Sequence, residues 1–296
     1  MGNHARVAHE NFSQAALVLL GHGSTKNVDS SAPVFQHAAE LRRRNIFSEV
    51  REAFWKQEPQ IQTVLPTLTA PRVFIVPLFI SEGYFSENVI PQALGFNLTD
   101  DPQSRFTFHA SRFTHYCRPV GTHESMTNVL LARAREVVEQ HPFPRAPKLS
   151  DITLIIAGHG TQQNDNSRKS IERQVESIRA RNEYAGVRAA FMEEEPRIAD
   201  VYAVANTRNI VVVPFFISDG LHAQEDIPVL LGEPERIVRE RLAVGQPTWR
   251  NPTERHGKRV WYSRSVGTEP LLAEVILERV CEAQAQPVGS LSPSAT

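Results

Sequence analysis

An internal repeat constrains this chain more than any other feature of its sequence. The segment LVLLGHGS at 17–24 returns as LIIAGHGT at 154–161, an offset of 137 residues. At the same offset, VPLFISEG at 76–83 matches VPFFISDG at 213–220. Self-similarity over so long a period is the signature of a duplicated structural unit. The sequence therefore predicts two homologous domains, one following the other.

The boundary between the repeats is predicted in the proline-rich segment HPFPRAPKLS at 141–150, because clustered prolines interrupt regular structure. This gives an N-terminal domain at 1–145 and a C-terminal domain at 146–296. A third matching segment, RPVGT at 118–122 and RSVGT at 264–268, lies toward the end of each domain.

Composition excludes several classes of protein. Hydrophobic residues make up 41% of the chain, enough for a buried core, and the net charge of −1 offers no attraction to nucleic acid or an anionic membrane. The 2 cysteines cannot build a disulfide framework, and no apolar run approaches the roughly 20 residues needed to span a bilayer. We expect a cytoplasmic protein with no nucleic-acid or membrane partner, either a monomer or a homodimer.

Each repeat reads as alternating strands and helices. In the second repeat, short apolar runs predict strands at 152–157, 187–192, 209–217 and 258–263, and three- and four-residue spacing predicts helices between them. A last helix at 269–285 is expected to close the second unit. Apolar strands separated by helices indicate an α/β fold, with a mainly parallel four-stranded sheet flanked by helices in each domain.

Ligand sites in such sheets lie beyond the carboxyl ends of the strands. Gly-His-Gly follows the first strand of each repeat and presents His22 and His159 there. In the second repeat His222 follows the third strand and Glu193 follows the second. Two imidazoles and a carboxylate on three strand ends form a plausible site for a divalent metal ion with open coordination positions.

The first repeat lacks two of these three groups. Phe85 replaces His222 and Lys56 replaces Glu193, so the first repeat is interpreted as a degenerate copy. Glu195 recurs as Glu58 before a proline in both repeats, which favours a structural role and makes Glu193 the better candidate.

The motifs GHGT, FMEEEP and VPFFISDGLHAQEDIP resemble those of the class II chelatases of the CbiX/SirB type, which insert cobalt or iron into sirohydrochlorin. The resemblance implies two tandem flavodoxin-like domains with the tetrapyrrole bound between them. It also implies that His159, His222 and Glu193 hold the metal and take up the pyrrole protons. The metal, Co²⁺ or Fe²⁺, would be a substrate, and no permanent cofactor would be needed.

The substrate implied by this resemblance is a sirohydrochlorin-like tetrapyrrole, a polycarboxylate, so cations and backbone or hydroxyl donors are expected around it. Arg264, Arg118, His22 and Ser218 are the candidates, although a repeated arginine is also typical of a structural salt bridge. Two alternatives stay open: a non-catalytic carrier of tetrapyrrole or metal, and a hydrolase, which the missing G-x-S-x-G motif disfavours. Imidazole and carboxylate ligands do not discriminate Co²⁺ from Fe²⁺ or Ni²⁺.

Overall fold

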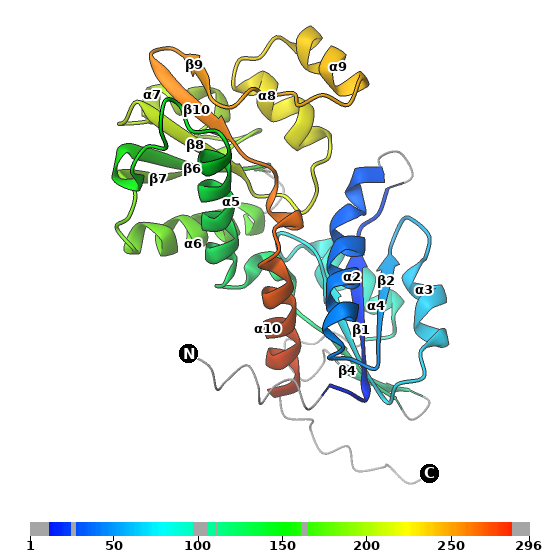
Figure 1. Cartoon of the computed structure of the whole chain (residues 1–296). Coiled ribbons are helices and arrows are strands. Elements are labelled where there is room, and N and C mark those ends of the chain that lie inside the picture. The colour runs from blue at the N-terminus through cyan, green and yellow to red at the C-terminus, as the bar shows by residue number, and fades with distance from the viewer. Residues whose placement is uncertain (1–11, 25–27, 97–105, 110–111, 161–164, 286–296) are drawn as a thin grey trace, which may run out of the picture. The chain divides into compact units, whose positions relative to one another are not determined.

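The computed structural model describes residues 12–24, 28–96, 106–109, 112–160 and 165–285 (Figure 1). Two compact units make up the chain, each built on a five-stranded sheet with helices packed against it. The prediction of an α/β fold with two tandem, mainly parallel sheets is confirmed. No helix in the described ranges has the length and apolar character required to cross a bilayer.

The strands are β1 (Ala15–Gly21), β2 (Glu49–Phe54), β3 (Arg72–Pro77), β4 (Phe106–His109), β5 (Arg112–Tyr116), β6 (Ile152–Gly158), β7 (Gly186–Phe191), β8 (Asn209–Pro214), β9 (Thr253–Arg255) and β10 (Lys258–Tyr262). The two sheets have the same topology, β2-β1-β3-β5-β4 in the first and β7-β6-β8-β10-β9 in the second. Four strands of each sheet run parallel, and the fifth pairs antiparallel with its neighbour at one edge. We predicted four strands in each sheet, because the short edge strands β4 and β9 carry no continuous apolar run.

The helices follow the strands as the repeat predicts. They are α2 (Ala32–Arg44), α3 (Ile61–Val64), α4 (Ile90–Ala93), α5 (Met126–Gln140), α6 (Asn166–Ala180), α7 (Val201–Val204), α8 (Ile227–Leu230), α9 (Glu235–Ala243) and α10 (Leu272–Ala285). A π-helical turn precedes α4 and α8, at Phe85–Val89 and His222–Asp226. These two turns occupy equivalent positions after the third strand of each sheet.

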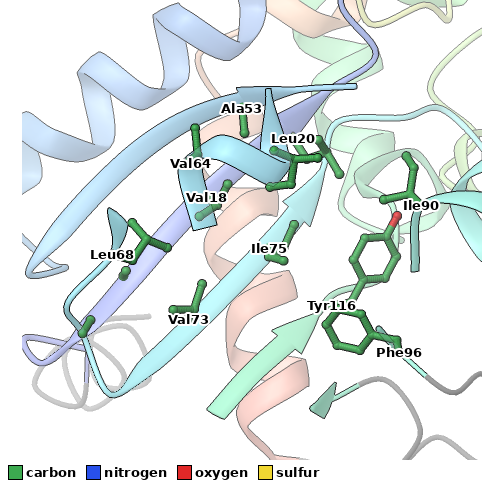
Figure 2. Close-up of a cluster of buried hydrophobic side chains, with 13 residues drawn as sticks. Val18, Leu20, Ala53, Val64, Leu68, Val73, Ile75, Ile90, Phe96 and Tyr116 are labelled. Atoms are coloured by element: carbon green, nitrogen blue, oxygen red, sulfur yellow. The ribbon is translucent and has the colours of Figure 1, made fainter. Parts of the chain in front are cut away.

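The strand that comes first in the sequence of each repeat, β1 or β6, is buried along its whole length, which explains its unbroken apolar sequence. All seven residues of β1 and of β6 are buried. Successive side chains of a strand point to opposite faces, so burial of every residue requires cover on both faces. Figure 2 shows one covered face, where Val18 and Leu20 pack against Val64 and Ile90 from the flanking helices.

The last helices of the two repeats are exchanged between the compact units. One unit contains 1–25, 34–123 and 273–296, and so includes α10; the other contains 26–33 and 124–272, and so includes α5. In Figure 1, α5 lies beside the green strands of the second sheet, although its sequence belongs to the first repeat. The expectation that the helix after Glu269 closes the second unit is therefore wrong. The predicted division at residue 145 concerns the sequence repeats, and the packing units are divided differently.

A buried arginine fixes each exchanged helix to its sheet. In α10, Arg279 donates to the carbonyl of Pro119 at 3.1 and 2.8 Å and to Thr122 Oγ1 at 2.7 Å. In α5, the equivalent Arg133 donates to the carbonyl of Ser265 at 3.0 Å and to Thr268 Oγ1 at 2.7 Å. Both arginines are 3% exposed. Each arginine therefore holds the Val-Gly-Thr turn of the other repeat: Arg279, from the second repeat, holds the turn of the first, and Arg133, from the first repeat, holds the turn of the second.

The glycine of each Val-Gly-Thr turn permits a close contact with the loop after the third strand. A Cβ atom on Gly267 would lie 1.5 Å from the carbonyl oxygen of Ile217, and one on Gly121 would lie 2.0 Å from that of Ile80. Only glycine fits at such a distance. The repeated motif thus links the end of the fourth parallel strand to the loop that carries the candidate site.

Arg279→Met and Arg133→Met are each expected to lower the free energy of unfolding by about 3 kcal/mol. The reason is that each change leaves buried acceptors without a donor. Urea denaturation followed by circular dichroism measures the effect. Arg43→Met, on the exposed face of α2, is the control and should change stability by no more than about 0.5 kcal/mol. If Arg279→Met and Arg133→Met were as stable as Arg43→Met, the structural role of the two buried arginines would be contradicted.

Candidate active site

The carboxyl ends of three neighbouring strands bring the candidate residues of the second unit together. His159 directly follows β6, Glu193 lies two residues beyond β7, and His222 begins the π-helical turn after β8. Because β6 lies between β7 and β8 in the sheet, His159 occupies the middle of this edge. His159 therefore has both Glu193 and His222 as neighbours.

His159 is held close to Glu193 through both backbone and side chain. The carbonyl of His159 accepts from the Glu193 amide at 3.1 Å, and His159 Nε2 lies 3.7 Å from Glu193 Oε1. The other ring nitrogen, Nδ1, lies 2.6 Å from the carbonyl oxygen of Gly160. A carbonyl can only accept, so in the neutral ring Nδ1 carries the proton and the lone pair is on Nε2, the atom that faces Glu193.

His222 meets His159 edge to face. Their ring centroids are 4.9 Å apart, with an interplanar angle of 82°. His222 Nδ1 lies 2.7 Å from Asp226 Oδ2, four residues later on the same turn. In both histidines Nδ1 is therefore occupied by an acceptor, which leaves Nε2 of the neutral ring as the atom for a cation or a proton.

The core fixes the turn that carries His222. Tyr262, at the end of β10, donates its hydroxyl to the carbonyl of Ala223 at 2.6 Å. Burial raises the pKa of Tyr262 well above its ordinary value, so the phenol stays a neutral donor. The first unit repeats this contact between Tyr116 and the carbonyl of Ser86 at 2.9 Å (Figure 2 shows Tyr116).

The three consecutive glutamates after β7 have different partners, and this separates their roles. Glu194 pairs with Arg168 at 2.6 Å, and Glu195 pairs with Arg197 at 3.0 Å. Glu193 instead approaches His159, and its side chain is 57% exposed. The geometry favours Glu193 over Glu195 as the carboxylate of the site, as the sequence repeat predicts.

The candidate site is open to solvent. The side chains of His159 and His222 are 36% and 50% exposed. Within the described residues, which omit 161–164 after Gly160, no three His, Cys, Asp or Glu side chains are grouped so that they could hold a metal ion together. Two imidazoles with a nearby carboxylate can hold a divalent ion while leaving coordination positions for another ligand. Such an open arrangement suits transient binding of a metal ion.

The corresponding edge of the first unit is aromatic. His22 Nδ1 lies 2.9 Å from the Gly23 carbonyl, as in the second unit, but its ring neighbour is Phe85, at a centroid distance of 5.3 Å. Trp55 and Phe79 lie 5.5 and 6.5 Å from the same Phe85 ring. A single imidazole among aromatic rings cannot replace the two imidazoles and carboxylate of the second unit. This supports the interpretation of the first repeat as a degenerate copy.

Both arginines predicted to bind substrate form salt bridges within their own units. Arg264 Nε lies 3.1 Å from Asp219 Oδ2, and Arg118 Nε lies 2.8 Å from Glu82 Oε1. These pairs link the end of the fourth parallel strand to the loop after the third. Their side chains remain 67% and 53% exposed, so the guanidinium groups also face solvent. Ser218 lies half-buried in the same loop as Asp219.

Sequence reasoning missed Asp226, although the signal was present. Its four-residue spacing from His222 places the two side chains on one side of a helical turn, and the first repeat has Val89 at this position. It also missed a cavity of about 600 Å³ beside the turn, which no local motif marks. Its lining residues include Trp249, Tyr262, Ala223 and Gln224. They do not include His159, His222 or Glu193.

A family model described as CbiX matches the chain twice, at residues 16–137 and 153–283. The chain belongs to the CbiX family. The expected membership in the class II chelatases is confirmed, and with it the expectation that the protein is an enzyme of the metallochelatase class.

Three similar proteins illustrate the relationship. A Halobacterium salinarum protein named "Probable sirohydrochlorin cobaltochelatase" is 44% identical over 287 residues, covering 93% of each chain. A multi-domain Deinococcus radiodurans protein, described as similar to chelatases with two additional novel domains, has a TM-score of 0.75 at 27% identity. That match covers 93% of this chain but 56% of the Deinococcus chain. SirB from Bacillus subtilis, solved with Fe³⁺, has a TM-score of 0.64 at 17% identity, covering 92% and 96%, which shows a shared fold.

Glu193→Gln is expected to weaken Co²⁺ binding several-fold, because it removes the negative charge beside His159. Glu195→Gln, which alters a carboxylate paired with Arg197, should leave Co²⁺ affinity within about twofold. Visible absorption of Co²⁺ titrated into each variant measures the dissociation constant. The reverse order of effects would assign the functional carboxylate to Glu195.

Proposed function

We propose that this protein inserts a divalent metal ion, Co²⁺ or Fe²⁺, into sirohydrochlorin. The observation that carries the proposal is the edge-to-face pair of His159 and His222, each with Nδ1 occupied and Nε2 left for a cation. Membership in the CbiX family and the name of the Halobacterium relative support sirohydrochlorin as the substrate and cobalt as a metal. The metal is a substrate in this proposal, and no permanent cofactor takes part.

The reaction exchanges two pyrrole N–H protons for one divalent cation. In the proposed mechanism His159 and His222 bind the ion through Nε2 and orient it toward the macrocycle. As the ion moves to the pyrrole nitrogens, the Nε2 atoms are freed, and His159 takes up the two pyrrole protons one after the other as the principal base. Glu193, 3.7 Å from His159 Nε2, stabilises the imidazolium that forms each time and passes each proton to solvent. The exposure of all three side chains provides the exit for protons.

The substrate's carboxylates need cationic partners, and we propose the two arginines that occupy equivalent positions in the two units. Arg264 and Arg118 use Nε in their salt bridges, and a guanidinium has further donors on its two Nη atoms. We include His22 and Ser218 as additional contacts to the macrocycle or its side chains. Pairing with Asp219 and Glu82 would hold each arginine in place before substrate binds.

His159→Ala and His222→Ala are each expected to reduce metal insertion to the spontaneous rate, because either change leaves one imidazole where the reaction needs two. His22→Ala, at the equivalent position of the first repeat, should keep kcat and at most raise KM for sirohydrochlorin. The change in macrocycle absorbance on insertion of Co²⁺ or Fe²⁺ measures the rate. Wild-type activity in the double variant His159→Ala/His222→Ala would overturn the site assignment.

A non-catalytic carrier would use the same groups, and turnover number distinguishes it from a chelatase. With sirohydrochlorin and Co²⁺ both in tenfold excess over protein, we expect product to accumulate well past one equivalent at a steady rate. Product formation that stops at one equivalent would identify a carrier. The measurement repeated with Fe²⁺ and Ni²⁺ ranks the metals, which share the same preferred ligands.

A further inference from the structure

Asp226, at the same edge of the second unit, has no part in the reaction proposed above. It begins the Asp-Ile-Pro segment and lies on the same π-helical turn as His222. Its Oδ2 atom is 2.7 Å from His222 Nδ1, within the range of a charge-assisted hydrogen bond. Its side chain is 44% exposed, so hydrogen bonding within a buried core does not account for its presence.

The first unit shows what the turn requires for folding. It has the same π-helical turn at Phe85–Val89, and the counterparts of His222 and Asp226 are Phe85 and Val89. The turn therefore forms with neither member of the pair. The histidine and the aspartate are present together in one unit and absent together in the other. This pairing points to a role in the chemistry of the imidazole.

An acidic neighbour on the same turn serves as a comparison. Glu225 pairs with Arg239 at 2.8 Å, and a hydrogen bond raises the pKa of that arginine. Asp226, in contrast, has a histidine as its ion-pair partner among the described residues. Its charge is therefore directed at His222, whereas that of Glu225 is offset by an arginine.

A carboxylate on Nδ1 has two consequences for a metal-binding histidine. It fixes the tautomer with the proton on Nδ1, which leaves the lone pair on Nε2. It also makes Nε2 a stronger electron-pair donor, and so a better metal ligand. His159 gains the first effect from a neutral carbonyl, that of Gly160. Of the two rings, His222 is the one whose Nδ1 atom is paired with an anion. The two imidazoles are thus unequal, and His222 is the better prepared to hold the metal.

We infer that Asp226 is a positioning residue that fixes the tautomer of His222 and strengthens its Nε2 as a metal ligand. This inference deepens the proposed chelatase function and rests on it for its biological meaning. It assigns metal capture chiefly to the His222–Asp226 pair. His159, beside Glu193, is then the imidazole better placed for the pyrrole protons.

Three variants test the inference. Asp226→Val introduces the residue that the first unit has at this position, so the variant should fold. We expect its dissociation constant for Co²⁺ to be 10–100-fold larger, and His222 to lose the single Nδ1–H tautomer. Asp226→Asn keeps an acceptor oxygen without the charge, so it should preserve the tautomer and lose affinity by a smaller factor. Glu225→Gln is the matched control on the same turn and should match the wild type in both measurements.

The tautomer is read from the ¹⁵N chemical shifts of His222 at fixed pH, assigned by comparison with His222→Ala. Co²⁺ affinity is read from visible absorption of the full-length protein without macrocycle. An unchanged tautomer and unchanged Co²⁺ affinity in Asp226→Val would overturn the inference. Equal losses in Asp226→Val and Glu225→Gln would also overturn it, because they would show a general effect of charge on the turn.

Failure of the proposed function gives a different result. A wild-type protein that binds Co²⁺ with the expected tautomer yet inserts no metal into sirohydrochlorin would contradict the chelatase proposal and leave the role of Asp226 intact. Conversely, rapid insertion by the wild type with full retention of kcat and of KM for Co²⁺ in Asp226→Val would contradict the role of Asp226 alone.

Discussion

The arrangement of both units depends on a buried guanidinium held against the Val-Gly-Thr turn. Arg279 and Arg133 each bind a backbone carbonyl and a threonine hydroxyl of the repeat to which their helix does not belong. A buried arginine is costly unless its donors are satisfied, so these hydrogen bonds specify where each helix docks. The exchange makes each unit incomplete without a helix from the other repeat. Duplication in one chain supplies both helices together.

The same turn also holds the loop that carries the candidate site. Gly267 contacts the carbonyl of Ile217, directly before Ser218 and Asp219, and Asp219 accepts from the Ser265 amide at 2.7 Å. Tyr262 then fixes the carbonyl of Ala223, beside His222. The imidazole is half exposed, but the backbone that carries it is held by buried contacts on both sides of the loop. A well-held backbone beneath an exposed site is consistent with the transient metal binding that we propose.

The sequence predicted those features that depend on local pattern. Unbroken apolar runs identified the parallel strands, and the strand-end rule placed His159, Glu193 and His222 at one edge, where the structure brings them together. The exchange of α5 and α10 was beyond reach, because periodicity shows which helix face is apolar but not which of two homologous sheets it covers. The edge strands β4 and β9 were missed for lack of an apolar run. Asp226 was overlooked because its four-residue spacing from His222 has meaning only if the segment forms a helical turn, which the sequence analysis had not predicted there.

The divergence of the two repeats shows how little of the fold the site determines. Phe85, Val89 and Lys56 replace His222, Asp226 and Glu193, and yet the turn, the tyrosine contact and the glycine contact persist in the first unit. The polar groups of the second unit are therefore not needed for folding. They are exposed, so ion pairing among them adds little stability in water. In the proposed function, their role is to orient two Nε2 lone pairs. A hydrogen bond to each Nδ1 fixes that orientation, and the anionic acceptor on His222 makes the two rings unequal.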